Sequence, residues 1–331
     1  LCKFILIVKQ IQILRTLYNP QVSDFTRHIY HYHDVRIFLD KGVIYMPSTY
    51  AHYRLGQEVL DNLTGGIKST ILNHKELYDI GLHGPDILFY YKPLFSCEVN
   101  KQGYDMHGRS GRQFFGNAAF VLKSLEGRDK EAALAYVYGF CCHFALDVSC
   151  HRYIDEKIEA DGVSHTEIEV EFDRSLMEKD GCNPVKHILT DHIKPSYKNA
   201  DIICRFYDNL SSEQVRKAME SMISYNRLLI APSRLKRMFI YGLLGITGNY
   251  KEMHGLIVNY KPNPLCEDSI QKLSNLYDSA VKLATILIGE FRDSAAGHIG
   301  FNKMYDYTFG SKLENKDNDG KELMCEGREA V

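Results

Sequence analysis

Side chains that commonly bind metals recur at helical spacing near the middle of the chain. His143, Asp147 and His151 follow one another at steps of four residues, and His165 and Glu169 repeat the step. Residues four apart in a helix return to nearly the same face, so each set would form a short ladder. His143 and His151 would lie roughly 12 Å apart along the axis, too far to bind one ion. If both are ligands, the site holds at least two metals, with Asp147 placed between them.

Three further candidate ligands lie upstream, each near the edge of an expected helix. His52 falls in the first turns of a helix expected over residues 50–62, and Asp86 opens a short helix. His107 lies in a loop that leads into a helix expected over residues 111–125. Taken singly, a carboxylate favoured by the helix dipole or a solvated histidine explains each of them. With the two ladders they make eight nitrogen and oxygen donors without a thiolate, which is the ligand set of catalytic zinc.

The first ladder lies in a stretch that is apolar on nearly every side. We expect a helix over about residues 129–157, buried inside a helical bundle. Polar groups in a buried helix must be paired, hydrogen-bonded or bound to a metal. The neighbouring Cys141, Cys142 and Cys150 are expected to be small buried hydrophobes rather than ligands.

The rest of the sequence predicts more helices. Further helical stretches are expected over residues 70–80, 164–178, 212–230 and 233–244, and an apolar stripe of 3.6-residue period runs from Ile270 to Phe291. There is no strand-type alternation, internal repeat or glycine-rich phosphate loop. We therefore expect an all-α protein, with a single-domain multi-helix bundle over residues 46–310.

The two ends of the chain are expected to lie outside this domain. Residues 1–45 begin with Leu1 rather than Met and show no clean helical period, which favours an extension upstream of a domain that starts at Met46. Residues 311–331 are charged and contain glycine, which predicts a disordered tail.

Several other polar residues near the second ladder are assigned to the surface. They are Glu167, Glu171 and Asp173 on the helix of that ladder, and His187, Asp191 and His192 after it.

Composition narrows the class of protein. A hydrophobic content of 45% and a charged content of 25% are ordinary for a globular chain of 331 residues. The formal net charge of −2 gives no basic surface for nucleic acid, and no apolar run reaches the roughly 18 residues of a transmembrane helix. Nine cysteines without paired CxxC spacing favour reduced thiols and a cytoplasmic location. A secreted location is the alternative, although no clear signal peptide is visible.

The chain resembles the zinc-dependent phospholipase C family in the motifs HFALDVSCH and HTEIE and in the order of His52, Asp86 and His107 before them. This family includes bacterial phosphatidylcholine-hydrolysing enzymes and the catalytic domain of clostridial alpha-toxin, and single-strand-specific zinc nucleases share its fold. The resemblance covers about residues 46–291. It implies a multi-helix bundle of this type and a cluster of two or three Zn²⁺ ions.

The resemblance also implies which residues bind each metal. One zinc would be held by Asp86, His107, His143 and Asp147, a second by His151, His165 and Glu169, and a third by His52 and Asp147. In the family the third metal also binds the N-terminal residue of the mature chain, a tryptophan, and this sequence has no tryptophan. A backbone group near Pro47, a weaker metal or no metal are the alternatives at that site. Asp86 is the implied general base.

The expected reaction is hydrolysis of a phosphodiester by metal-activated water. The first hypothesis is a phospholipase C, which releases diacylglycerol and a phosphorylated head group, with a phospholipid or other phosphodiester as substrate and transient contact with a membrane surface. A phosphoesterase or nuclease on a non-lipid substrate is the second, and a non-catalytic metal-binding helical protein is the third. The low net charge argues against nucleic acid, and we expect a monomer.

Overall fold

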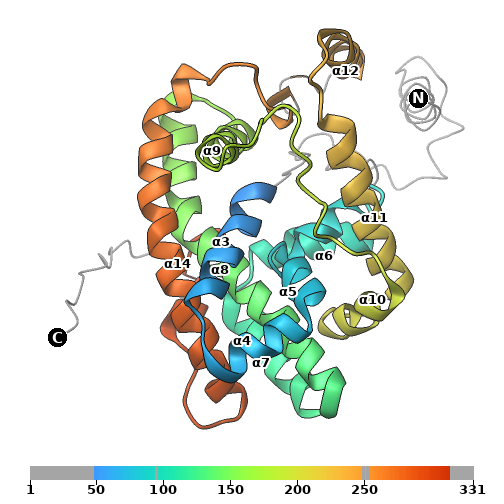
Figure 1. The fold of residues 1–331 in the computed structure, drawn as a ribbon, viewed down its shortest axis with the longest axis vertical. Helices are drawn as coiled ribbons and strands as arrows, with labels where there is room; N and C mark the ends of the chain where they lie inside the picture. Colours follow the sequence, from blue (N-terminus) through green and yellow to red (C-terminus); the bar gives the residue numbers. More distant parts are fainter. Residues whose placement is uncertain (1–47, 94–95, 248–249, 251–253, 314–331) are drawn as a thin grey trace, which may run out of the picture.

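The longest helix, α8 (Gly127–Asp161), runs through the middle of the molecule and carries the first ladder (Figure 1). The computed structural model describes residues 48–93, 96–247, 250 and 254–313. Every residue of α8 from Ala135 to Val148 is buried, as the apolar sequence predicted. By length and composition α8 could cross a membrane, but 89% of its most apolar window is buried within the protein, which is expected of a core helix.

The other helices surround α8. In chain order they are α3 (Thr49–Asn62), α4 (Gly65–Asn73), α5 (Lys75–Gly81), η2 (Gly84–Tyr90), α6 (Glu98–His107), α7 (Gly111–Lys123), α9 (His165–Lys179), α10 (Tyr197–Ile203), η3 (Cys204–Phe206), α11 (Ser212–Leu229), α12 (Arg234–Thr247), η4 (His254–Leu256), η5 (Pro264–Cys266), α14 (Glu267–Ala295) and η6 (Lys303–Asp306). Within the described residues the only β-type pairings are two isolated bridges, Ser110 with Thr308 and Tyr307 with Leu313. The all-α prediction is confirmed.

Helix α14 packs along α8, as Figure 1 shows. Its stripe of Leu273, Tyr277, Val281, Ala284, Ile288 and Phe291 is buried, whereas Ile270 at the start of the expected stripe is half-buried. The stripe therefore serves core packing.

Helix α5 crosses α8 so closely that their backbones are in contact. A Cβ atom on Gly81 would lie 2.2 Å from the carbonyl oxygen of Tyr136, and one on Gly139 would lie 2.2 Å from the carbonyl oxygen of Tyr78. Only glycine fits at both positions, because it has no Cβ. The crossing holds η2, which follows α5, against α8.

Two expected elements differ from the structure for tertiary reasons. The single helix expected over residues 70–80 is two helices, because His74 leaves the helical conformation (φ −129°, ψ 40°) and its ring is buried near Glu131 of α8. The turn there lets α5 lie across α8. His107, expected in a loop, is instead the last residue of α6.

The expected extension and most of the expected tail lie outside the described residues. At the C-terminal end, the Ser311 hydroxyl donates hydrogen bonds to the carbonyl oxygens of Asp147 (3.3 Å) and Val148 (2.8 Å). Residues 311–313 are thus attached to α8, and the described fold continues past the expected boundary at residue 310.

Candidate metal centre

The fold brings all eight candidate ligands together in the interior of the bundle. His52 comes from α3, Asp86 from η2, His107 from α6, the first ladder from α8 and the second from α9. Their donor atoms form three groups, each within 4.8 Å: His52, Asp86 and His143; His107, His143 and Asp147; and His151, His165 and Glu169.

The first part of the centre joins α8 to η2 and α6. His143 Nε2 lies 3.1 Å from Asp147 Oδ2, and His107 Nε2 lies 2.9 Å from Asp86 Oδ1. The two pairs are linked, since His107 Nε2 is 3.8 Å from Asp147 Oδ2 and His143 Nδ1 is 3.8 Å from Asp86 Oδ2. These four residues are the set that the resemblance assigned to one zinc.

The second part of the centre lies between α8 and α9. Glu169 Oε1 is 3.2 Å from His165 Nε2 and 3.8 Å from His151 Nε2. One carboxylate oxygen therefore faces two imidazoles from different helices, as expected for the second predicted site.

Asp147 lies between the two parts. Its Oδ2 faces His143 and His107, whereas its Oδ1 is 3.3 Å from His52 Nε2 and 3.9 Å from His151 Nε2. The bridging position expected from sequence is geometrically available. His52 also stacks on His143 (ring centroids 4.5 Å apart) and groups with Asp86, so it belongs as much to the first part as to a separate third site. The backbone near Pro47 lies outside the described residues.

Backbone carbonyls orient two of the imidazoles. His107 Nδ1 lies 2.9 Å from the carbonyl oxygen of Gly103, and His151 Nδ1 lies 2.8 Å from that of Phe309. A carbonyl oxygen can only accept, so each Nδ1 must donate, and in the neutral ring Nε2 keeps its lone pair. Both Nε2 atoms face carboxylates of the centre. A histidine held in this way is pre-oriented to bind a metal through Nε2.

Buried polar atoms of the centre are left unsatisfied by the protein. Among the described residues, seven of them have no hydrogen-bond partner: His52 Nδ1, both oxygens of Asp86, both ring nitrogens of His143, Asp147 Oδ2 and Glu169 Oε2. A buried unsatisfied group costs about 1–3 kcal/mol, more if charged. A cation bound among these nitrogen and oxygen atoms would remove that cost, so the residues present fit zinc.

The electrostatics also favour a cation. Burial would raise the pKa of Asp147, but the imidazoles of His143 and His151 hold it well below its usual range. Burial would also raise the pKa of Glu169, but His165 and His151 lower it to about 2. Burial disfavours charge on His151, yet Asp147 and Glu169 raise its pKa to about 10. These two carboxylates are therefore ionised at neutral pH, and a metal that binds here must displace protons from imidazole.

The three cysteines near the first ladder behave as expected. Cys141, Cys142 and Cys150 are buried, and burial raises the pKa of each thiol, that of Cys142 to about 12. They stay protonated at neutral pH and belong to none of the donor groups.

The expected solvated face of α9 is wrong for Asp173 and Glu171, which are both buried. Asp173 accepts hydrogen bonds from the backbone N–H groups of Tyr50 (2.9 Å) and Ala51 (2.8 Å) and from the hydroxyl of Ser48. It thus caps the start of α3, the helix that carries His52. Glu171 accepts from the side chain of Asn259 and the backbone N–H of Asn263. Asp173 follows Glu169 by four residues, so the spacing of the second ladder places it on the same inward face of α9.

His192, expected at the surface, is half-buried. Its Nε2 lies 2.7 Å from Nε2 of His83, and its ring stacks on Tyr53 at 4.0 Å. Burial lowers the pKa of His192 to about 3 and that of His83 well below its usual range, so this pair is neutral. One ring donates to the other. Asp191 is exposed, as expected.

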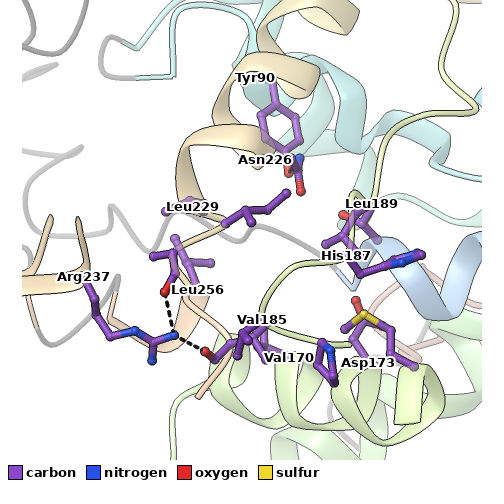
Figure 2. Close-up of a pocket in the computed structure, with 16 residues that line it drawn as sticks. Tyr90, Val170, Asp173, Val185, His187, Leu189, Asn226, Leu229, Arg237 and Leu256 are labelled. Carbon is purple, nitrogen blue, oxygen red and sulfur yellow. Dashed lines mark hydrogen bonds between the residues drawn. The ribbon is translucent and has the colours of Figure 1, made fainter. Parts of the chain in front are cut away.

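A pocket next to α3 and α9, two of the helices that carry candidate ligands, is enclosed by α9, α11 and the segments that flank α12 (Figure 2). None of the eight candidate ligands lines it. About 610 Å³ between its walls is free of protein atoms, and part of this space is open solvent. Thr49, Tyr90 and Asp173 line the part near α3, and Arg237 lies at the other end, where its guanidinium donates to the carbonyl oxygens of Ala231 and Val258. Most of the remaining wall is apolar: Val170, Met177, Pro184, Val185, Leu189, Leu229, Ile230, Ala231, Leu256 and Val258.

Comparison with protein families identifies a family for this chain. The model described as zinc dependent phospholipase C matches residues 51–222, just over half of the chain, and this span contains all eight candidate ligands. The comparison with curated proteins and that with solved structures each found no match.

Proposed function

The chain belongs to the zinc-dependent phospholipase C family, and we propose that it hydrolyses a phospholipid to diacylglycerol and a phosphorylated head group. The observation that supports this most strongly is the group of unsatisfied buried donors on His52, Asp86, His143, Asp147 and Glu169. The low net charge of −2 makes nucleic acid a less suitable substrate than a lipid.

We propose that two or three zinc ions occupy the centre. Asp86, His107, His143 and Asp147 would hold one, and His151, His165 and Glu169 would hold another. A third would use His52 and Asp147. Zinc at such a site supplies neutralisation of the phosphodiester oxygens and activation of a water molecule.

Asp86 is the proposed general base. Its carboxylate is 1% exposed, and both oxygens lack a hydrogen-bond partner among the described residues, so one can accept a proton from the attacking water. As the water oxygen bonds to phosphorus, the bond from phosphorus to the glycerol oxygen breaks, and that oxygen takes up a proton to give diacylglycerol. His107 Nε2 lies 2.9 Å from Asp86 Oδ1 but outside hydrogen-bond geometry, so this contact leaves the carboxylate free to accept the proton.

The pocket next to α3 and α9 is the proposed place for a non-reacting part of the substrate. Its wall is largely apolar, with a few polar side chains, Tyr90, Asp173, Asn226, His187 and Arg237, at separate positions. This combination suits an amphipathic molecule such as a phospholipid.

The test is zinc content combined with a substrate panel. We expect two or three zincs per chain, hydrolysis of phospholipids but not of nucleic acid, and loss of activity with a chelator. Asp86→Asn should keep most of the zinc and lose turnover by about 10²–10⁴-fold, the usual contribution of a general base. Full activity of Asp86→Asn would exclude the proposed role, and cleavage of nucleotides alone would favour the non-lipid alternative.

A further inference from the structure

Helix α12 exposes a group of large apolar side chains on its outer surface. The exposed fractions are 74% for Leu235, 66% for Met238, 53% for Phe239 and 64% for Ile246. Other exposed large apolar side chains are spread over several other elements of the described fold, for example Leu72 on α4 and Phe120 on α7. The helix itself stands at one end of the molecule, at the top of Figure 1.

Helical geometry places these side chains on one stripe. At about 100° per residue, Leu235, Met238, Phe239 and Ile246 fall within an arc of about 100°. Gly242 lies in the middle of the arc and leaves the stripe flat, since nothing is within 4 Å of where its Cβ would be. The stripe runs from Leu235 to Ile246, and Gly242 is the one residue of the arc between Phe239 and Ile246.

The opposite face of α12 attaches the helix to the body. Ile240 packs in a small apolar cluster with Ala231 and Ile257, and Tyr241 and Leu244 pack against that cluster. This cluster is separate from the main core. The helix is therefore apolar on two sides, and in the described part of the chain the small cluster with Ala231 and Ile257 forms on one of them.

Basic residues border the exposed stripe. Arg234 and Lys236 lie about 100° to either side of Leu235, and residues 231–247 contain no acidic residue. Arg234 is exposed. Lys236 is half-buried and its Nζ donates to the carbonyl oxygens of Arg227 and Ile230 at the end of α11, which keeps its charge at the edge of the stripe.

We propose that the exposed stripe of α12 docks on the surface of an anionic phospholipid bilayer. An apolar stripe between basic edges is the pattern of a helix that lies in the plane of a membrane, with its apolar side among the acyl chains and its positive charges near anionic head groups. The choice of a lipid partner rests on the proposed function, because an enzyme that acts on phospholipid must reach a bilayer.

The position of the pocket supports the same partner. Arg237 is on the buried side of α12 and lines the pocket, together with Ile230 and Ala231 just before the helix. Tyr260 covers the Arg237 guanidinium at 3.9 Å and is itself 44% exposed. A bilayer seated on the stripe would therefore lie one helix diameter from the pocket next to α3 and α9.

The test is vesicle binding by the zinc-loaded full chain, measured by co-sedimentation. One set of vesicles contains phosphatidylcholine alone and the other also contains phosphatidylglycerol. We expect Leu235→Ser combined with Met238→Ser to weaken binding to the second set at least tenfold, equal to about 1.4 kcal/mol. Arg234→Gln should weaken binding to the anionic vesicles only, and less so at high salt.

The matched control is Leu72→Ser combined with Phe120→Ser, two helical positions that are 55% and 74% exposed on other helices. We expect it to bind vesicles like the unaltered chain. Equal binding by the two double variants would overturn the proposal, as would absence of vesicle binding by the unaltered chain. A dimer that dissociates in the Leu235→Ser/Met238→Ser variant would also overturn it, because a second copy would then cover the stripe.

Hydrolysis of a soluble short-chain phospholipid separates this inference from the proposed function. If both are right, the α12 double variant keeps that activity and loses activity on vesicles. If vesicle binding depends on α12 but no phospholipid is hydrolysed, the docking proposal is supported and the phospholipase activity is refuted. If the short-chain phospholipid is hydrolysed but vesicle binding does not depend on α12, the phospholipase activity is supported and the docking proposal is refuted.

Discussion

Replacement of Gly139 by alanine should separate α5 from α8 and disturb the metal centre at a distance. The new Cβ would lie 2.2 Å from the carbonyl oxygen of Tyr78 and 3.0 Å from Cα of Gly81. Non-bonded heavy atoms are comfortable only at roughly 3.5 Å, so α5 would have to move by about 1 Å. Neither partner is a flexible side chain that could turn away, because both are backbone atoms of a packed helix.

The loss of stability in Gly139→Ala can be measured against the same substitution at Gly289, a helical glycine with free space around it. Overpacking costs about 1–3 kcal/mol or more. Gly289 in α14 is also helical but has nothing within 4 Å of its Cβ position, so Gly289→Ala should gain about 0.5–1 kcal/mol from lost backbone freedom in the unfolded chain. Gly139→Ala gains the same amount from the unfolded chain, so the free energies of unfolding of the two variants should differ by the overpacking cost alone, about 1–3 kcal/mol or more.

Urea unfolding of the zinc-loaded variants measures this difference, and elemental analysis gives the zinc content. Gly139→Ala should also lose zinc, since α5 leads directly into η2 and Asp86. Equal stability of Gly139→Ala and Gly289→Ala would refute the tight crossing. Lower stability with full zinc content would show that the crossing does not position Asp86.

Three further outcomes follow from the centre and its surroundings. Asp147→Asn should lower zinc content more than Glu169→Gln, because the oxygens of Asp147 face histidines of both parts whereas Glu169 faces one part; equal losses in elemental analysis would argue against the bridging position. Asp173→Asn should cost about 1–3 kcal/mol at pH 7, because an amide cannot accept from all three donors at the start of α3; unchanged urea unfolding would exclude the cap. His192 has a folded pKa of about 3, below an unfolded value of about 6.5, so the unfolded chain alone gains a proton as the pH falls below that value. Protonation of His192 in the unfolded chain should therefore lower the free energy of unfolding by about 2 kcal/mol between pH 7 and pH 5. The His192→Gln variant should not show this loss; parallel plots of unfolding free energy against pH for the two proteins would contradict the prediction.

The features that the sequence alone predicts correctly are those governed by one side-chain period. The burial of α8 and α14 and the common face of His143, Asp147 and His151 follow from helical repeat alone. The meeting of the two ladders with His52, Asp86 and His107 could not be derived from spacing, because it depends on how five helices pack. The family resemblance supplied that step, and the geometry is compatible with it.

The residues that differ from the sequence prediction share a physical cause. Charged side chains usually lie in solvent, which predicts exposure for Glu171 and Asp173, but each accepts from backbone N–H groups of a distant segment that compensate for its burial. His83 and His192 likewise form their neutral pair with each other, although they are more than one hundred residues apart in the sequence. Helix breaks such as that at His74 are likewise set by a neighbouring helix. Local sequence contains no information about such partners.

The bond between Phe309 and His151 bears on where this protein can be divided. The family match ends at residue 222, yet the carbonyl oxygen that orients His151 comes from residue 309, and the Phe309 ring lies against His107 and His143. A fragment cut at the family boundary would retain every candidate ligand and lose both this carbonyl and α14. The centre thus depends on a C-terminal segment that the family description leaves out, and fragments meant to bind metal should extend through Leu313.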